Sequence, residues 1–215
     1  ADDMVLFALV TPIDGVGRVL ASAGPCVLRT ASRFPVIGIM RIDSDDVDAL
    51  ATNGRLAAVV LHEILHVIGI GTLWRARDML VGAGGADPRF IGLLAAAQCN
   101  SSGGLATCSD GRVPVENSGG SGTVDVHWRE ASFDAEVMTG FVESNAEMPL
   151  SAISIASLQD LGYVVNEGAA DAFAITSLLV QAGASPALVP LNEVPLTGPL
   201  YEMDAVGRKR LVPRR

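Results

Sequence analysis

The chain has 215 residues, of which 49% are hydrophobic, so it is long enough for one large domain or for a domain with an extension. Its 24 acidic and 15 basic residues give a formal net charge of −9, which argues against a surface that follows the phosphates of a nucleic acid. No apolar run approaches the roughly 20 residues that span a bilayer, so we expect no membrane span.

The first part of the chain contains two β-rich runs and a predicted pair of helices. MVLFALV (4–10) and PVIGIMRI (35–42) are predicted strands. We interpret the first as a buried strand, because it is too short for a signal peptide and follows two aspartates; a secretory signal would lie outside this sequence. DSDDVDALA (43–51) is predicted to begin a helix with its aspartates as N-cap residues. Residues 55–70 form a second predicted helix, which is apolar nearly all round and therefore typical of a helix buried inside a domain.

The middle of the chain is rich in glycine and has little regular periodicity. A short helix is predicted over 89–98, and loops are predicted over most of the remainder up to about residue 150. Cys99 and Cys108 flank a Ser/Gly-rich loop that a short disulfide could close, which favours an oxidising compartment. Cys26 is left as the odd cysteine.

The last part of the chain begins with one more predicted helix. PLSAISIASLQDLGY (149–163) fits an amphipathic helix that ends at Gly162. Beyond it the sequence is rich in alanine and proline, with one helical patch at AFAITSLLVQAG (172–183). The only basic cluster is the terminal RKRLVPRR (208–215), to which we assign no function.

Three polar side chains interrupt the apolar helix predicted over 55–70. His62, Glu63 and His66 form the H-E-x-x-H pattern of zinc proteases. Residues four apart on a helix share a face, so both imidazoles can point at one metal ion, while the adjacent glutamate can reach a water molecule on that ion. Gly69 follows as in the longer pattern H-E-x-x-H-x-x-G-x-x-H, but Thr72 stands where that pattern has its third histidine.

A catalytic zinc ion needs three protein ligands and one open position. His127 is the only histidine outside the motif, so a third histidine ligand would have to be His127. Carboxylates remain alternatives at this point, because a folded loop can bring any of them to the metal: Glu116, Glu130, Glu136 and Asp78.

Residues 15–166 resemble the leishmanolysin-type family of metzincin metalloproteases, in which an insertion separates the motif glycine from the third histidine. The matching segments occur in the family's order: VLASAGPCVLR (19–29), FPVIGIMRID (34–43), LHEILHVIGIGTLW (61–74), VPVENSGGSGT (113–123), HWRE (127–130), EVMTG (136–140) and LSAISIASLQDLGY (150–163). The resemblance implies that His62, His66 and His127 hold one catalytic zinc ion. It also implies Glu63 as general base and acid, and Met138 as the methionine of the tight turn beneath the zinc.

The resemblance implies an α+β, metzincin-like catalytic domain with a twisted mixed sheet, a central active-site helix and a loop-rich C-terminal half. We place this domain at 1–168, with an N-terminal half of about 1–74 and a C-terminal half of about 75–168. We expect 169–215 to be an extension that packs on or continues the C-terminal half, with a tail over about 205–215 that could be flexible.

The resulting expectation is a zinc-dependent endopeptidase that acts on proteins or peptides, and the resemblance places it outside the cell or at the cell surface. Two alternatives stay open. One is a zinc protease of another class with an acidic third ligand. The other is a binding or adhesion module that keeps the fold without catalysis.

Overall fold

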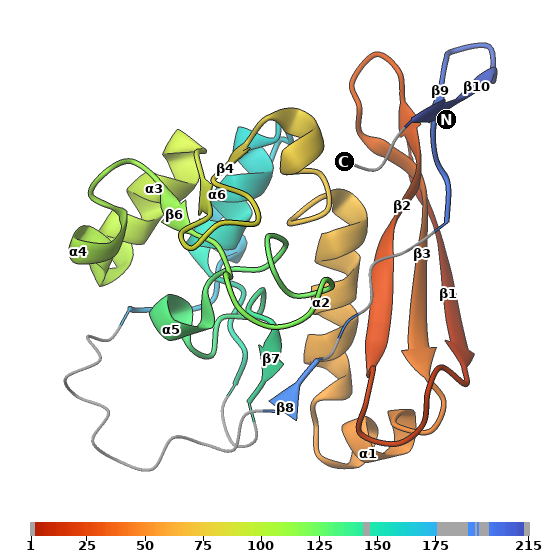
Figure 1. The fold of residues 1–215 in the computed structure, drawn as a ribbon, viewed down its shortest axis with the longest axis horizontal. Coiled ribbons are helices and arrows are strands. Elements are labelled where there is room, and N and C mark those ends of the chain that lie inside the picture. Colours follow the sequence, from red (N-terminus) through yellow and green to blue (C-terminus); the bar gives the residue numbers. More distant parts are fainter. Residues whose placement is uncertain (1–2, 144–146, 176–188, 192, 194–197, 213–215) are drawn as a thin grey trace.

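The structure, a computed structural model, describes residues 3–143, 147–175, 189–191, 193 and 198–212. Its largest sheet has five strands in the order β1-β3-β2-β9-β10 and stands along one side of the molecule (Figure 1). β3 is parallel to β1 and antiparallel to β2, β2 is parallel to β9, and β9 and β10 form an antiparallel hairpin. These strands are β1 (Val5–Thr11), β2 (Ala21–Arg29), β3 (Pro35–Asp43), β9 (Leu200–Met203) and β10 (Lys209–Val212).

The helix predicted over 55–70 is confirmed as α2 (Leu56–Ile68), which follows the short helix α1 (Val47–Thr52). α2 packs on β2 and β3 and stands between the sheet and the C-terminal half of the chain (Figure 1). Val59 on α2 belongs to the core beneath the sheet, while Leu65 belongs to the core of the C-terminal half. The helix is apolar nearly all round because it is buried from both sides.

The strand predicted at 4–10 is present as β1, but the prediction that it is buried is wrong. β1 is the edge strand of the sheet, and Val5, Phe7 and Val10 are 52%, 55% and 60% exposed. Among the described helices, α2 packs mainly against β2 and β3 and not against β1. A continuous apolar run does not distinguish an edge strand from a central one, because it lacks the alternation that identifies a half-buried face.

The aspartates predicted to cap the first helix have a different role. Asp46 is the N-cap residue of α1, but its side chain makes no capping hydrogen bond and instead accepts one from the backbone N–H of Gly17 at 2.8 Å. Asp43 accepts hydrogen bonds from the backbone N–H groups of Asp14 and Asp45, both at 3.0 Å. The acidic run therefore fixes the loop between β1 and β2 against the start of α1.

The C-terminal half is built from short elements around an aromatic core. Trp74 contacts both Trp128 and Phe90, with ring centroids 4.5 and 5.1 Å apart. The elements of this half are η1 (Arg75–Arg77), β4 (Leu80–Val81), β5 (Arg89–Phe90), α3 (Leu93–Cys99), η2 (Asn100–Gly104), α4 (Leu105–Cys108), β6 (Val113–Pro114), α5 (Glu130–Phe133), β7 (Phe141–Val142), α6 (Ala152–Asp160) and η3 (Glu167–Ala169).

Two helices of this half differ from their predictions. The helix predicted over 89–98 begins at Leu93, because Arg89 and Phe90 pair with β4 and β6 in a three-stranded sheet. The helix predicted over 149–163 is present as α6, but it is not amphipathic: every residue from 153 to 158 is buried. Its serines form hydrogen bonds inside the domain. Polar residues on this helix therefore do not indicate a solvent-exposed face.

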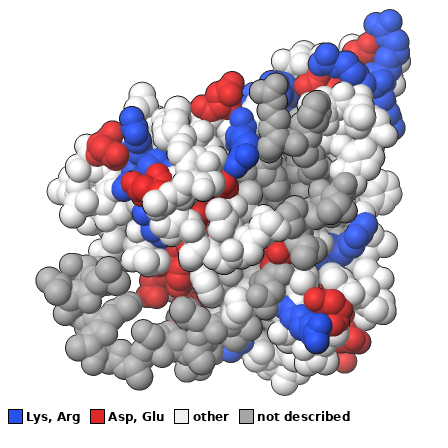
Figure 2. Space-filling view, in the orientation of Figure 1, with Lys and Arg blue, Asp and Glu red and all other residues white. Residues whose placement is uncertain are grey.

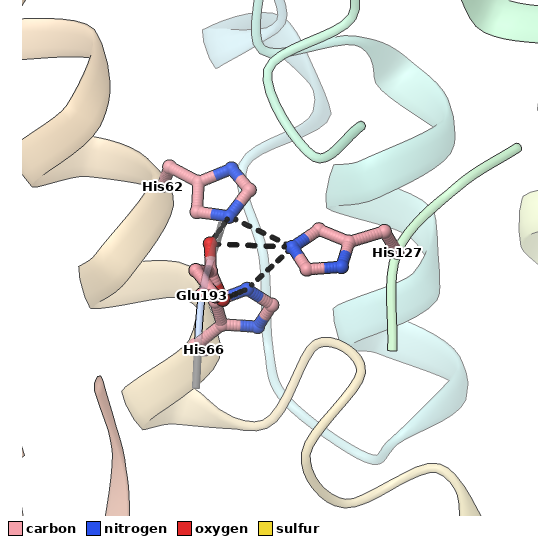
Figure 3. Close-up of side chains that lie close together, drawn as sticks. All are labelled: His62, His66, His127 and Glu193. Atoms are coloured by element: carbon pink, nitrogen blue, oxygen red, sulfur yellow. Dashed lines mark hydrogen bonds and ion pairs between the residues drawn. The ribbon is translucent and has the colours of Figure 1, made fainter. Parts of the chain in front are cut away.

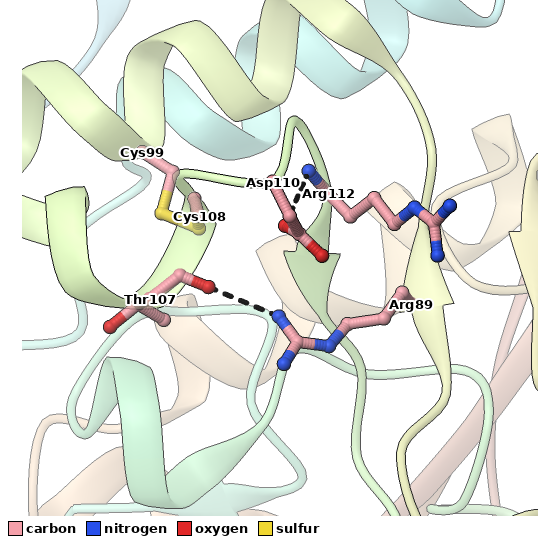
Figure 4. The surroundings of a disulfide bond; sticks show 6 residues. All are labelled: Arg89, Cys99, Thr107, Cys108, Asp110 and Arg112. Atoms are coloured by element: carbon pink, nitrogen blue, oxygen red, sulfur yellow. Dashed lines mark hydrogen bonds between the residues drawn. A yellow bond between two sulfur atoms is a disulfide. The ribbon is translucent and has the colours of Figure 1, made fainter.

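The predicted pairing of Cys99 with Cys108 is present as a disulfide that joins the C-terminal ends of α3 and α4 (Figure 4). Beside it, the Arg89 guanidinium donates a hydrogen bond to the carbonyl of Thr107 at 3.0 Å (Figure 4). The bond and this contact hold a glycine-rich bend against β5. Cys26, on β2, is a free and partly buried thiol.

The extension beyond residue 168 contacts both halves of the molecule. β8 (Val189–Pro190) pairs with β7 in the C-terminal half, whereas β9 and β10 join the edge of the N-terminal sheet. The helical patch predicted at 172–183 lies largely outside the described residues. Much of the tail predicted at about 205–215 forms β10, and its basic side chains gather at this end of the molecule (Figure 2). The described residues include no helix that is both long and apolar enough to cross a membrane.

Candidate metal centre

α2 carries three polar residues at its buried centre. The side chains of His62, Glu63 and His66 are essentially inaccessible to solvent. The two imidazoles lie one helical turn apart, as the i, i+4 spacing predicts, and their ring centroids are 4.6 Å apart. Burying three such groups is costly unless each finds a partner, so the surroundings of this turn determine what the site can do.

The chain leaves α2 through two glycines with positive φ. Gly69, at φ 125°, ends the helix, and Gly71 follows at φ 72°. A Cβ atom on Gly71 would lie 1.9 Å from the carbonyl oxygen of Val126, so only glycine allows the two segments to touch. Thr72 donates a hydrogen bond from its hydroxyl to the carbonyl of His66 at 2.6 Å. Thr72 thus supplies a hydrogen-bond donor to one of the backbone carbonyls at the C-terminal end of the helix.

The segment that touches Gly71 brings His127 to the two histidines of α2. Its Nε2 atom lies 3.0 Å from Nε2 of His62 and 3.0 Å from Nε2 of His66 (Figure 3). The neighbouring backbone is fixed on both sides: the His127 carbonyl accepts from the N–H of Glu116, and the N–H of Trp128 donates to the carbonyl of Met138. All three imidazoles therefore converge on one point.

Hydrogen bonds at the other ring nitrogens identify the tautomers. The Nδ1 atoms lie next to backbone carbonyl oxygens: 2.5 Å from Val137 for His62, 2.9 Å from Ile70 for His66, and 3.0 Å from Thr123 for His127. A carbonyl oxygen can only accept, so each Nδ1 carries a proton, and each imidazole presents a lone pair at Nε2 when it is neutral. Three lone pairs facing one another repel unless a cation lies between them.

Glu193, from the C-terminal extension, completes this group of side chains. One carboxylate oxygen lies 2.7 Å from Nε2 of His62 and 3.3 Å from Nε2 of His127, and the other lies 3.2 Å from Nε2 of His66 (Figure 3). The side chain is only 7% exposed. Burial alone would raise the pKa of Glu193, but the three histidines outweigh it and hold that pKa well below the ordinary range.

The histidines respond unequally to this environment. Burial lowers the pKa of His62 to about 4. Burial also acts to lower the pKa of His66, but the Glu193 carboxylate more than offsets it and raises that pKa above its ordinary value. A neutral His62 is the form that binds a metal.

Glu63 is the one member of the motif outside this cluster. Among the described residues, neither of its carboxylate oxygens has a hydrogen-bond partner, although the side chain is fully buried. Burial, together with the nearby charge of Glu193, raises the pKa of Glu63 well above its ordinary value. Such a carboxylate readily accepts a proton at neutral pH.

These donors suit a zinc ion. Zinc with bonds of about 2.0–2.1 Å to nitrogen keeps tetrahedral ligands about 3.3 Å apart, close to the 3.0 Å from Nε2 of His127 to Nε2 of His62 and to Nε2 of His66. His62, His66, His127 and Glu193 all offer one atom within 4.8 Å of the others. The lone pairs at Nε2 and the unpartnered oxygens of Glu63 also fit a metal ion with a reactive water beside it.

A sequence model of the family described as Leishmanolysin matches residues 1–179, which include His62, Glu63, His66 and His127. The chain belongs to the leishmanolysin family. The family is one of zinc metalloproteases that act on proteins, and its members are typically found at the cell surface or outside the cell. No curated protein matches the chain.

Met138, which the resemblance to the leishmanolysin family placed beneath the zinc, lies in a tight turn that contacts the site. The turn closes with a hydrogen bond from the N–H of Thr139 to the carbonyl of Glu136 at 3.0 Å. The carbonyl of Val137, within the turn, contacts His62. Met138 is fully buried in the core of the C-terminal half.

The four carboxylates considered as rival third ligands are absent from the histidine cluster. Glu116 accepts hydrogen bonds from its own loop and from the N–H of Glu130, and Glu136 accepts from Met138, Ser151 and Ser154. Sequence reasoning about the leishmanolysin motifs missed Glu193. It lies 66 residues from His127 in a segment beyond the family match, and no local pattern marks it.

Proposed function

We propose that the protein is a zinc-dependent endopeptidase of the metzincin type. In this proposal His62, His66 and His127 hold one catalytic zinc ion, and Glu63 acts as general base and then as general acid. The convergence of the three Nε2 lone pairs beside the unpartnered Glu63 carboxylate carries the proposal. The family supports the reaction class.

A bound zinc ion supplies a Lewis acid that activates water near neutral pH and polarises the peptide carbonyl. Glu63 accepts the proton of the attacking water and delivers it to the leaving amine. Its burial and its raised pKa favour both steps, because the group binds the proton firmly between them. The carbonyls of Val137, Ile70 and Thr123 hold the imidazoles in the tautomer that keeps Nε2 free.

The turn that carries Met138 supports the same proposal. It contacts His62 through Val137 and is joined to the chain beside His127 through the Trp128–Met138 hydrogen bond. We propose that Met138 forms the floor below the zinc and holds these two ligands in register. The disulfide between Cys99 and Cys108 supports action outside the cell or at its surface, where disulfides persist.

Replacing Glu63 with Gln tests the proposed chemistry. The amide cannot accept the proton, so we expect casein hydrolysis to fall about 10²–10⁴-fold while the variant still binds one equivalent of zinc. Zinc content is measured by atomic absorption on the same preparations. Glu167→Gln, at an exposed glutamate, is the matched control and should retain both properties. Measurable hydrolysis at equal rates in the wild type and Glu63→Gln contradicts the mechanism.

Replacing His127 with Ala separates the proposal from the alternative with an acidic third ligand. We expect the variant to bind zinc more weakly and to lose activity, because only His62, His66 and the Glu193 carboxylate remain in the cluster, and none of the four carboxylates considered as rival third ligands lies there. Zinc content and activity that both survive this change would establish a different ligand set.

A further inference from the structure

Glu193 stands where an open catalytic site would admit water or substrate. Its carboxylate oxygens are 2.7–3.3 Å from the three Nε2 atoms, comparable with the 3.0 Å that separates Nε2 of His127 from Nε2 of His62 and from Nε2 of His66. The Glu193 carboxylate thus lies beside all three nitrogens and can take the fourth position around a metal ion held between them (Figure 3). Tetrahedral sites with four protein ligands are closed, whereas catalytic zinc sites keep one position open.

The chain just before Glu193 is anchored to both halves of the molecule. The N–H of Leu191 donates to the carbonyl of Gly140 at 3.1 Å, and the carbonyl of Leu191 accepts from the N–H of Leu20 at 3.2 Å. Leu191 is 1% exposed and packs with the core beneath the sheet. β8 adds its pairing with β7. Glu193 thus reaches the histidines from a backbone that is held in place two residues away.

The charges around Glu193 favour a metal cation between its carboxylate and the imidazoles. Within the described part of the chain, no lysine or arginine forms an ion pair with its carboxylate, and the like charge of Glu63 lies nearby. A buried carboxylate is stable only when a positive charge compensates it. A divalent ion between the imidazoles and the carboxylate would provide that charge.

We propose that Glu193 is the fourth protein ligand of the zinc ion and that it closes the site against water and substrate. The proposal rests on the zinc site of the proposed function. Peptide hydrolysis then requires the Glu193 carboxylate to leave the metal, so the C-terminal extension restrains the activity of the domain that carries it. Removing the carboxylate opens one coordination position and weakens zinc binding.

Cobalt-substituted protein tests this directly, because the visible spectrum of Co²⁺ responds to its ligands. Acetohydroxamate, which binds open metal positions through its two oxygens, is titrated into the wild type, Glu193→Gln and Glu193→Ala. We expect at least about tenfold tighter acetohydroxamate binding in both variants than in the wild type. Competition with a chelator should show at least about tenfold weaker zinc binding in the variants. Glu167→Gln is the matched control and should behave as the wild type.

The outcomes separate this proposal from the proposed function. Unchanged acetohydroxamate and zinc affinities in both variants overturn the role of Glu193, whatever the peptidase activity. Altered affinities support that role even if no variant hydrolyses casein, a result that would leave the metal closed by Glu193 but contradict the peptidase. Faster casein hydrolysis by Glu193→Ala, lost again in the Glu63→Gln/Glu193→Ala double variant, supports both.

Discussion

Buried carboxylates have distinct surroundings in this protein, and the surroundings separate their roles. Glu136 is fully buried yet satisfied, because Met138, Ser151 and Ser154 all donate to it. It ties the turn beside His62 to the start of α6. Glu63 is equally buried and has no partner among the described residues. A satisfied carboxylate stabilises the fold, whereas an unpartnered one beside a metal site is available for proton transfer.

Glu130 provides a test at the scale of one residue, because it lies in an acidic group with Asp134 and Glu143. Burial, helped by the charges of those two residues, raises the pKa of Glu130 to about 7. A carboxyl group with a raised pKa in the folded state contributes stability below its unfolded value of 4.5, and this contribution is lost as pH rises through about 7. Between these values, the free energy of unfolding therefore falls with rising pH.

Glu130→Gln should remove this part of the pH dependence. The amide stays neutral, so we expect the variant to gain stability relative to the wild type as pH rises from about 5.5 to 8. Urea unfolding of both proteins at each pH measures the difference, in which contributions common to both proteins cancel. A difference in stability that stays constant across this range would show that Glu130 titrates normally.

The sequence could predict the residues of the site only where they share one helix. His62, Glu63 and His66 followed from the i, i+4 spacing, which fixes their geometry without further information. His127 was a candidate by elimination, and its role was implied by the resemblance. Glu193 could not be predicted, because its position depends on where a distant strand pairs and not on any local pattern.

At the scale of the elements, the exit from α2 determines where the third histidine lies. Gly71 touches Val126 directly, and Val126 precedes His127. We expect Gly71→Ala to displace this segment and weaken zinc binding, with a loss of stability beyond the roughly 1–2 kcal/mol of left-handed backbone strain. Chelator competition and thermal unfolding measure the two effects.

Gly54→Ala is the matched control for this change. Gly54 has a similar φ of 77°, but an added Cβ there would meet nothing within 4 Å. It should therefore lose only the strain energy and keep its zinc affinity. Equal zinc affinities in the two variants would mean that the contact at Gly71 does not position His127.

β1 and α6 show that a sequence pattern predicts the secondary-structure type of an element better than it predicts how deeply that element is buried. The strand at β1 and the helix at α6 were both predicted, yet β1 is exposed and α6 is buried on all sides. What covers an element is decided by its neighbours. α2 packs on β2 and β3. On α6, Ser154 donates a hydrogen bond to Glu136 and accepts one from Trp128, and the N-cap residue Ser151 also donates to Glu136.

At the scale of the whole molecule, the candidate site lies where three separate segments meet. α2 supplies two histidines from between the halves, the loop-rich half supplies the third, and the extension supplies Glu193 (Figures 1 and 3). The extension also adds β9 and β10 to the N-terminal sheet. The proposed closure by Glu193 restrains the activity of the chain without a second protein.

The central claim, a zinc ion held by three histidines, is tested most directly by a crystal structure of the zinc-loaded protein with anomalous scattering at the zinc edge. We predict one anomalous peak at about 2.0–2.1 Å from the Nε2 atoms of His62, His66 and His127. A peak elsewhere, or a zinc ion that lacks any one of these histidines as a ligand, would contradict the account.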